Sequence, residues 1–437
     1  MQKPEPNSHN YTMMKRILLL FLLAGFIVTS CDDDNDTPSS MFTVTVENVI
    51  PASSIFASGA VDAIPPGGTL EFSFNAGIGH YLSYSTMLVQ SNDLFYAPAQ
   101  NGLALYNGRT AVTGDVTAQF DLWDAGTEVN QEPGVGADQA PRQSGPDTGA
   151  DENGTVGLVN DSFTYPADED IIRVTLAHDG GTRFTVTVEN LSDNATLTTP
   201  LAPGVWAIHG STVNPFFTDG EAASQGLEES AEDGNTTNFI AALQAETGYS
   251  SPFAPGVFAV FESGDDNPIF VSGTATTNGL EGLAEDGDPS TLATSVAAAE
   301  STEAYGVFNT PVGASGPGPI LTGGSYSFQF EAEEGDVLTF ATMLVQTNDL
   351  FIAPPQTGIA LFENGQPLSG DITNTLMLWD AGTEVNEFPG AGNYQPTRQP
   401  GGNMGTDENG LVRIVNDGYT YPTISNQVRV TISAPAN

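Results

Sequence analysis

One long segment of this chain is present twice, and this repetition restricts the possible folds more than any other feature. Residues 64–175 align with residues 320–431 without a gap. TMLVQSNDLF in the first copy returns as TMLVQTNDLF in the second, and LWDAGTEVN is the same in both. The repetition predicts two domains of one fold, and it marks the residues that both copies kept.

Short segments with alternating apolar and polar residues predict an all-β fold. FTVTVENV (42–49) returns as FTVTVENL (184–191), and TLEFSF (69–74), IRVTL (172–176) and YSFQF (326–330) have the same character. Gly, Pro, Asn and Asp clusters separate these segments, as is typical of the turns of β-sandwiches. We therefore predict two tandem β-sandwiches, each with FTVTVEN as its first strand and RVT as its last.

The predicted domains are residues 41–179 and 182–435, joined near 177–183. The second would carry an insertion at 200–300 that is itself duplicated, because LAPGVWAIHG and FAPGVFAVFE lie in it one after the other. An AEDG sequence follows each of them, and we interpret both AEDG sequences as structural turns. Short helices are predicted at 235–246 and 288–300, with Asn235 and Asp288 as N-caps.

The N-terminus predicts export. Lys15 and Arg16 precede a short apolar segment that ends at Val28-Thr29-Ser30-Cys31, so residues 1–31 have the form of a signal peptide with a lipobox. Cys31 is the only cysteine, and we predict that it is lipidated; the alternative is an ordinary signal peptide with an incidental cysteine. Residues 1–12 are interpreted as a spurious extension and residues 32–40 as an acidic tether. The predicted location is the outer membrane or cell surface of a Gram-negative bacterium.

The charge balance restricts the partners. The chain has 54 acidic residues, 10 basic residues and a formal net charge of -44. Nucleic acids and anionic membranes attract clustered Lys and Arg, so neither is an expected partner, and membrane contact is expected only through the lipid anchor. Such acidity suits cation binding or simple solubility in salty water.

The motifs NDLF and LWDAGTE, together with APGV and AEDG, resemble those of the spondin N-terminal domain family. The resemblance covers nearly all of the mature chain as two domains, the first of which would lack APGV–AEDG. The family pattern has Trp at Leu94 and Leu350, Pro at Leu122 and Leu378, and Asp at Glu128 and Glu384. The resemblance implies a C2-like β-sandwich and a bound Ca²⁺. The metal ligands that it implies are Asp93, Asp124, Glu128, Asp349, Asp380 and Glu384.

Calcium prefers six to eight hard oxygen ligands, so a cluster of carboxylates is a reasonable site. From the residues alone, a second interpretation stays open: Asp124 and Asp380 cap a hairpin, while Glu128 and Glu384 face solvent. The DENG loops at 151–154 and 407–410 are predicted to be solvated turns.

No arrangement typical of nucleophilic catalysis, zinc binding or phosphate binding is visible, so we predict a protein that is not an enzyme. The predicted function is an envelope-anchored, calcium-binding adhesion or matrix-binding module whose partner is an unknown extracellular protein or glycan. The alternatives are a carbohydrate-binding module, favoured if aromatic rings are exposed beside the ion, and, last, an enzyme that acts on glycans.

Overall fold

The computed structural model describes residues 37–435 and contains twenty-six β-strands and five α-helices within this range. All strand pairs are antiparallel apart from one isolated bridge, and they form sheets stacked in pairs, so the predicted all-β sandwich fold is confirmed. The signal peptide, Cys31 and residues 32–36 of the tether lie outside the described residues. No helix in the described part of the chain is both long and apolar enough to cross a membrane.

Sandwich A, as we name it, extends from β2 to α3. Its smaller sheet has the order β3 (Thr69–Asn75), β13 (Arg183–Asn190), β12 (Ile172–Gly180) and β9 (Gly114–Asp115). Its larger sheet has the order β11 (Gly157–Leu158), β10 (Phe120–Asp124), β5 (Leu94–Pro98), β4 (His80–Met87), β14 (Gly204–Gly210) and β2 (Ile55–Val61), with β6 (Leu103–Ala104) beside β4. A small hairpin joins β7 (Tyr106–Asn107) to β8 (Thr110–Ala111), and its helices are α1 (Asp168–Ile171), α2 (Gln225–Asp233) and α3 (Thr237–Ala245).

Sandwich B comprises β1 and the elements from β15 to β26. Its smaller sheet has the order β17 (Ser325–Glu333), β1 (Ser39–Asn48), β26 (Val428–Ser433) and β23 (Gly370–Asp371). Its larger sheet has the order β16 (Ala304–Phe308), β15 (Phe253–Glu262), β18 (Asp336–Leu344), β19 (Leu350–Ala353), β24 (Met377–Asp380) and β25 (Arg413–Ile414), with β20 (Ile359–Ala360) beside β18. The hairpin β21 (Phe362–Glu363) and β22 (Gln366–Pro367) and the helices α4 (Leu280–Asp286) and α5 (Ser290–Ala298) complete it.

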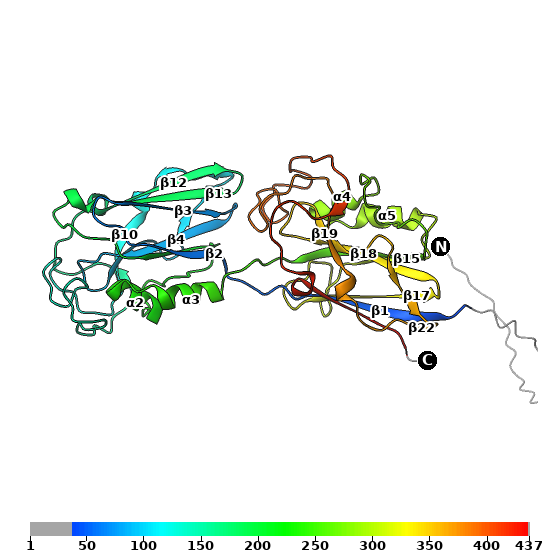
Figure 1. Cartoon of the computed structure of the whole chain (residues 1–437), viewed down its shortest axis with the longest axis horizontal. Coiled ribbons are helices and arrows are strands. Elements are labelled where there is room, and N and C mark those ends of the chain that lie inside the picture. Colours follow the sequence, from blue (N-terminus) through cyan, green and yellow to red (C-terminus); the bar gives the residue numbers. More distant parts are fainter. Residues whose placement is uncertain (1–36, 436–437) are drawn as a thin grey trace, which may run out of the picture. The chain divides into compact units, whose positions relative to one another are not determined.

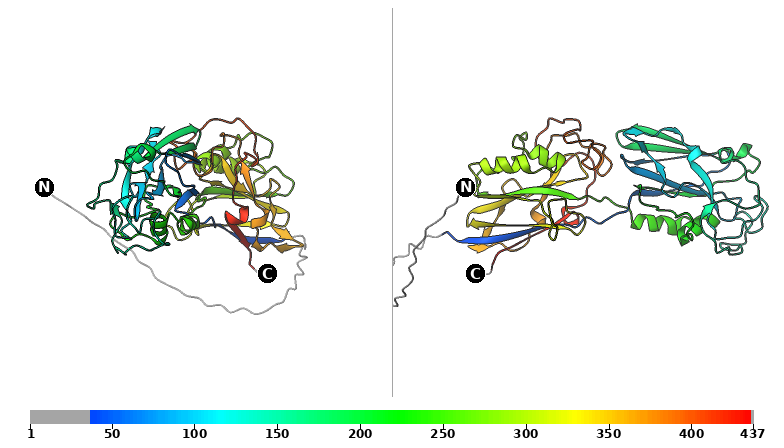
Figure 2. Two further views of the ribbon diagram at one scale, coloured as in Figure 1. Left: turned by 60° about the vertical axis from the view of Figure 1, so that its left-hand side comes forward. Right: turned by 180° about the vertical axis from the view of Figure 1, so that it is seen from behind.

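Each sandwich has three layers, and each interface between layers has its own apolar core. In sandwich A, Phe184, Val186 and Val188 of β13 point toward the larger sheet and are fully buried there. The other face of the larger sheet packs on α2 and α3, with Leu227 and Phe239 among the buried side chains. Figures 1 and 2 show α2 and α3 along one face of this sheet, and α4 and α5 in the same relation to β15 and β18. The alternating pattern of the strands therefore produces the first core, and the helices protect the second face of the larger sheet from water.

The strand pairing corrects the predicted domain boundaries. Residues 177–183 are no linker, because β12 and β13 pair with each other across this segment in one hairpin. The first FTVTVEN sequence, in β1, pairs with β17 and β26, so it belongs to sandwich B. The second, in β13, pairs with β3 and belongs to sandwich A. In chain order, sandwich A therefore lies between the first strand of sandwich B and the remainder of sandwich B.

The two APGV–AEDG segments do not lie in one domain, contrary to the prediction; each belongs to a different sandwich. The first supplies β14, α2 and α3 of sandwich A, and the second supplies β15, α4 and α5 of sandwich B. Neither segment is an insertion, and the first sandwich is not a truncated variant. The predicted helices are confirmed as α3 and α5, and the carboxamide of Asn235 and the carboxylate of Asp288 accept hydrogen bonds from Thr237 N and Ser290 N.

Candidate metal centre

Asp93 and Asp124 lie side by side because of the register of two strands. Asp93 immediately precedes β5, and Asp124 is the last residue of β10, where it pairs with Leu94. In sandwich B, Asp349 precedes β19 and Asp380 pairs with Leu350. The duplication has therefore placed two carboxylates at the same end of the same strand pair in both sandwiches.

Each of the first aspartates uses only one of its two oxygens within the protein. Oδ2 of Asp93 accepts hydrogen bonds from Thr127 N at 2.7 Å, from Thr127 Oγ1 at 3.1 Å and from Glu128 N at 3.1 Å. Asp349 accepts the same three bonds from Thr383 and Glu384. Oδ1 of both aspartates is buried and has no hydrogen-bond partner among the described residues. Such an oxygen is costly to bury unless something positive or a donor reaches it.

The DAGTE sequence forms a tight turn around the second aspartate. Oδ1 of Asp124 accepts a hydrogen bond of 2.7 Å from Gly126 N, and its Oδ2 accepts one of 2.7 Å from Asn130 Nδ2. Gly126 has φ +69° and an added Cβ would lie 2.7 Å from backbone atoms of Thr155, so only glycine fits there. Asp124 and Asp380 thus each accept a hydrogen bond from the glycine of their own turn, and Oδ2 of Asp380 also accepts one from Arg413.

Glu128 and Glu384 differ from the second interpretation of the sequence, in which they face solvent. Each is only 2% exposed, so neither faces solvent. The carboxylate of Glu128 accepts hydrogen bonds from Asn92 Nδ2 at 3.1 Å and Gly149 N at 2.8 Å. It forms a group with Glu232 and Asp147, whose oxygens lie within 4.8 Å of one another. In sandwich B the acids whose oxygens lie this close are a different set, Asp349, Asp380 and Glu408. Of the six predicted residues, Glu128 belongs to the group in sandwich A, and Asp349 and Asp380 belong to the group in sandwich B.

Sequence reasoning missed Glu232 and Glu285, the glutamates of the two AEDG sequences. They are 3% and 2% exposed and lie in the last turns of α2 and α4. Burial, with smaller contributions from Glu128 and Asp93, raises the pKa of Glu232 to about 8. Burial, with Glu384 and Asp349, raises the pKa of Glu285 to about 8. A helix C-terminus also disfavours a negative charge. The duplication of AEDG was the signal that could have identified them.

The pKa values of the cluster aspartates are also raised. Burial and the Asp124 carboxylate raise the pKa of Asp93 to about 7. Burial raises the pKa of Asp349 to about 6, and burial with the nearby Asp349 raises that of Asp380 to about 7. Burial also raises the pKa values of Asp124, Glu128 and Glu384. Burial and, at several of these residues, a neighbouring carboxylate therefore disfavour the charged form.

The donor set fits a hard divalent cation. It offers several carboxylate oxygens, of which Oδ1 of Asp93, Oδ1 of Asp349 and Oε2 of Glu285 have no partner among the described residues. Oδ1 of Asn130 and of Asn386 are buried and unpartnered in the same way. Sandwich B also has a cleft of about 340 Å³ that is lined in part by Glu285, Asp286 and Asn403. A cation would satisfy these oxygens and lower the repulsion.

Trp123 and Trp379, each next to a cluster aspartate, are structural. They are 5% and 4% exposed, and their indole N–H groups donate to Ala97 O and Pro354 O. Trp123 packs against Phe217 and Trp379 against Phe270. Neither tryptophan offers the exposed ring that a sugar platform beside the ion requires.

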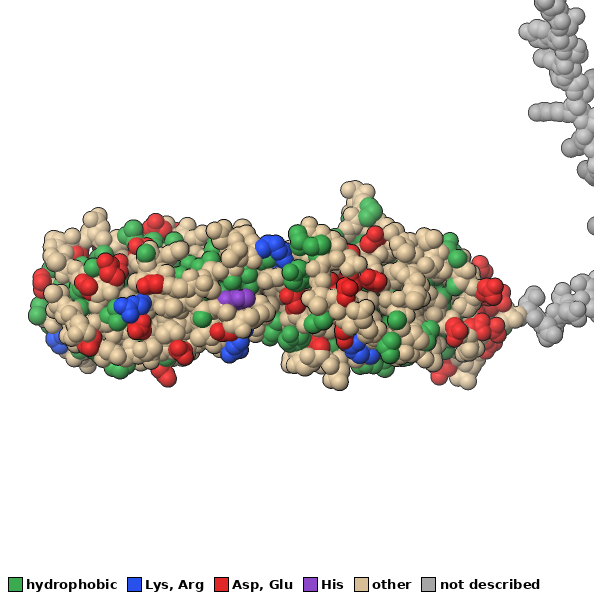
Figure 3. All heavy atoms as spheres, turned by 90° about the horizontal axis from the view of Figure 1, so that it is seen from above, with side chains coloured by type: hydrophobic (Ala, Val, Ile, Leu, Met, Phe, Trp, Pro, Cys, Tyr) green, Lys and Arg blue, Asp and Glu red, His purple; other side chains and the backbone are tan. Residues whose placement is uncertain are grey.

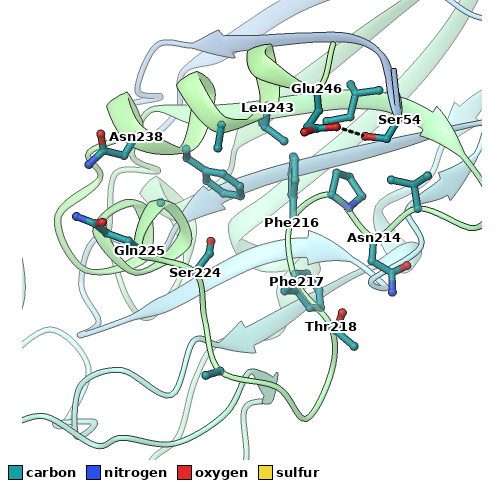
Figure 4. A pocket seen from close by; sticks show the side chains of 17 residues that line it. Ser54, Asn214, Phe216, Phe217, Thr218, Ser224, Gln225, Asn238, Leu243 and Glu246 are labelled. Atoms are coloured by element: carbon teal, nitrogen blue, oxygen red, sulfur yellow. Dashed lines mark hydrogen bonds between the residues drawn. The ribbon is translucent and has the colours of Figure 1, made fainter. Parts of the chain in front are cut away.

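Sandwich A also has a cavity of about 720 Å³ on its helical layer, separate from the acidic cluster (Figure 4). Phe216, Phe239 and Leu243 line it. At one end, Glu246 accepts a hydrogen bond of 3.3 Å from Ser54 Oγ. Its floor is apolar and its rim carries Asn214. None of the cluster carboxylates lines this cavity, so the cavity is not part of the candidate metal centre.

The surface outside the clusters is acidic as well. On the face drawn in Figure 3, Asp and Glu side chains are spread widely and Lys and Arg side chains are few. Among residues 37–435, four contacts between acidic and basic side chains meet the distance of an ion pair, and none involves the sandwich A cluster. Comparisons of the chain with protein-family models and with curated proteins find no match.

Proposed function

We propose that this protein is a non-catalytic, calcium-binding adhesion or matrix-binding module of the spondin type, exported and held on the bacterial envelope by a lipid at Cys31. The observation that carries the calcium assignment is the unpartnered, buried Oδ1 of Asp93, repeated at Asp349. Both oxygens stand among other carboxylates whose pKa values burial raises. The resemblance of NDLF and DAGTE to the spondin N-terminal domain family supports the adhesive role.

Asp93, Asp124 and Glu128 would hold the cation in sandwich A, with Glu232 close to them, and Asp349, Asp380 and Glu408 would hold it in sandwich B. When bound, calcium would neutralise the carboxylates and stiffen the loops that carry them. Both sandwiches would then present ordered loops to an extracellular protein or glycan. The alternative of a carbohydrate-binding module lacks support at this point, because both tryptophans beside the clusters are buried.

The calcium assignment is tested by thermal unfolding of chelated protein with and without millimolar Ca²⁺. A ligand at about 100-fold its Kd adds roughly 2.7 kcal/mol, so the melting temperature should rise by several degrees and EDTA should reverse the rise. Magnesium should do less, because it retains its water and demands octahedral geometry.

The double variant Asp93→Asn with Asp349→Asn is the matched probe. The amide oxygen of Asn can accept the three bonds now made to Oδ2, while its NH₂ group replaces the free oxygen. The protein should fold and lose its calcium response. Asp62→Asn with Asp265→Asn, at exposed positions in the two sandwiches, should keep the response. Calcium stabilisation that survives in the Asp93/Asp349 variant would contradict the assignment.

The adhesive role and the anchor need separate measurements. Binding of the purified protein to an array of matrix proteins and glycans should be detectable with Ca²⁺ and lost with EDTA. Release of the Cys31→Ser variant from the membrane fraction should accompany loss of the lipid. Equal partitioning of wild type and variant would rule out the lipid anchor.

A further inference from the structure

One difference between the two acidic clusters is an arginine. Two acids differ as well, because Asp147 aligns with Asn403 and Gln131 with Glu387. In sandwich B, Arg413 lies at the start of β25 and pairs with Asp380 across the strands. The aligned residue in sandwich A is Gly157, at the start of β11, which pairs with Asp124. The aspartates of NDLF and DAGTE are the same in both copies. The duplication therefore allows a comparison of Asp380, which has an arginine beside it, with Asp124, which has a glycine in that position.

Arg413 occupies the outer side of its cluster. Its Nη2 lies 2.8 Å from Oδ2 of Asp380 and 2.8 Å from each carboxylate oxygen of Glu408. Asp349, Asp380 and Glu408 are the three acids whose oxygens lie within 4.8 Å of one another. The guanidinium group therefore contacts two of the three, while Oδ1 of Asp349 still has no partner among the described residues.

Sandwich A has no such internal charge. Within residues 37–435, no arginine forms an ion pair with an acid of its cluster. Burial, and after it Asp124 and Asp161, raise the pKa of Glu152, the residue aligned with Glu408. The acids of sandwich A thus face one another with only neutral donors between them.

We propose that Arg413 is a built-in competitor of the metal ion, which makes the two calcium sites unequal: sandwich A binds tightly and sandwich B binds weakly. This inference rests on the proposed calcium binding. A divalent cation at Asp349 and Asp380 would meet the positive charge of Arg413 at short range, and it would share Asp380 and Glu408 with that side chain. About a third of the Arg413 side chain is exposed, 35%, so it can move into solvent, but only by giving up its ion pairs.

Two consequences follow for the whole chain. Sandwich A should depend on calcium for its stability, because nothing else there offsets the acids. Sandwich B should stay folded without calcium, and its site should bind calcium only at a higher calcium concentration. The protein would then respond to calcium in two separate concentration ranges.

The test adds an arginine to the sandwich A site and removes the arginine charge from the sandwich B site. Gly157→Arg is sterically open, because an added Cβ would meet only Oδ1 of Asp219, at 4.0 Å. Arg413→Gln removes the charge of the other site and keeps much of the side chain. Arg429→Gln is the matched control, because Arg429 pairs with Glu47 in the same sandwich but outside the cluster.

Calcium affinity is measured by calorimetric titration of chelated, full-length protein. Each site is measured alone, with the other removed by Asp93→Asn or Asp349→Asn. We expect the sandwich B site to be weaker than the sandwich A site by at least about tenfold. Arg413→Gln should tighten it toward the sandwich A value, Gly157→Arg should weaken the sandwich A site, and Arg429→Gln should change neither.

A second measurement separates competition from a purely structural role. In EDTA, Arg413→Gln should lower the melting temperature, while in saturating calcium it should not. If Arg413→Gln weakens calcium binding, the residue supports the site rather than competing for it, and the inference is overturned. Equal calcium affinities of the two sites, unchanged by Arg413→Gln and by Gly157→Arg, would also overturn the inference. That result would leave the proposed function intact. No calcium uptake by either site would overturn both.

Discussion

At the residue scale, the geometry around Glu128 and Glu384 depends on two glycines that sequence inspection passes over. Gly149 N donates to Oε1 of Glu128, and an added Cβ at Gly149 would lie 2.3 Å from the same carboxylate. Gly405 stands in the same relation to Glu384, where the distance would be 2.1 Å. Neither glycine has a positive φ, so close approach rather than backbone conformation requires them.

Gly149→Ala should therefore destabilise sandwich A by about 1–3 kcal/mol, the usual cost of forcing extra atoms into a packed site. Urea unfolding of chelated protein measures the change. Gly145→Ala is the control, because a Cβ there meets nothing within 4 Å. Equal stability of the two variants would show that the Glu128 carboxylate moves aside freely.

The buried glutamates of AEDG give the calcium-free protein an unusual dependence on pH. Their folded-state pKa values are raised to about 8, above those of an unfolded chain. The folded state therefore binds more protons between about pH 4.5 and 8, and stability falls as pH rises through this range. The calcium-free protein should melt at a higher temperature at pH 5.5 than at pH 8, and Glu232→Gln with Glu285→Gln should reduce the difference. Melting curves in chelator at several pH values test this, and a stability that rises toward pH 8 would contradict it.

At the element scale, β1 is the most consequential strand. It lies between β17 and β26 in the smaller sheet of sandwich B, and Phe42, Val44 and Val46 on its inner face are fully buried. Each of these side chains contributes about 1.5–3 kcal/mol when buried. Without β1, β17 and β26 would lose their common partner and expose unpaired backbone groups.

A fragment of residues 249–437, which lacks β1, should therefore show no cooperative melt. A synthetic peptide of residues 38–50 should restore one, measured by circular dichroism on titration. A peptide of residues 183–192 should do so in part, because it carries the same FTVTVEN sequence. A scrambled peptide is the control, and a cooperative melt of the fragment alone would show that β1 is dispensable.

At the scale of the whole molecule, the chain order of the two sandwiches decides which fragments fold. Sandwich A is continuous from β2 to α3, whereas sandwich B is assembled from β1 and the elements after β15. A cut at residue 179 would remove β13 from the sheet of β3 and β12, and would also remove β14, α2 and α3.

Residues 51–248 should consequently form an autonomous domain with a cooperative melt and one calcium site. Residues 41–179 should be aggregated or unfolded, because the fragment exposes both apolar faces of the larger sheet. Differential scanning calorimetry of the two fragments compares them directly. Cooperative folding of 41–179 would indicate that β1 can replace β13 in sandwich A.

The sequence by itself determined the all-β class, the presence of two equivalent domains, the helices α3 and α5 and the acids of NDLF and DAGTE, whereas the N-cap positions are Thr236 and Pro289, one residue after the predicted Asn235 and Asp288. These are local features: alternation of period two, turn residues, and motifs a few residues long, each visible in a short window and each written twice. The adjacency of Asp93 and Asp124 also follows from strands close in the chain.

Only the tertiary structure decided which sheet each FTVTVEN strand joins, because the two sequences are the same and local pattern cannot distinguish two partners of equal quality. The two-residue reversal between β12 and β13 favours pairing of neighbours along the chain, which leaves β1 for sandwich B. Tertiary structure also brought Glu232 near Asp93, which precedes it in the chain, and Glu285 near Asp349, which follows it. Contacts over such separations depend on how the layers stack, and no window of sequence contains that information.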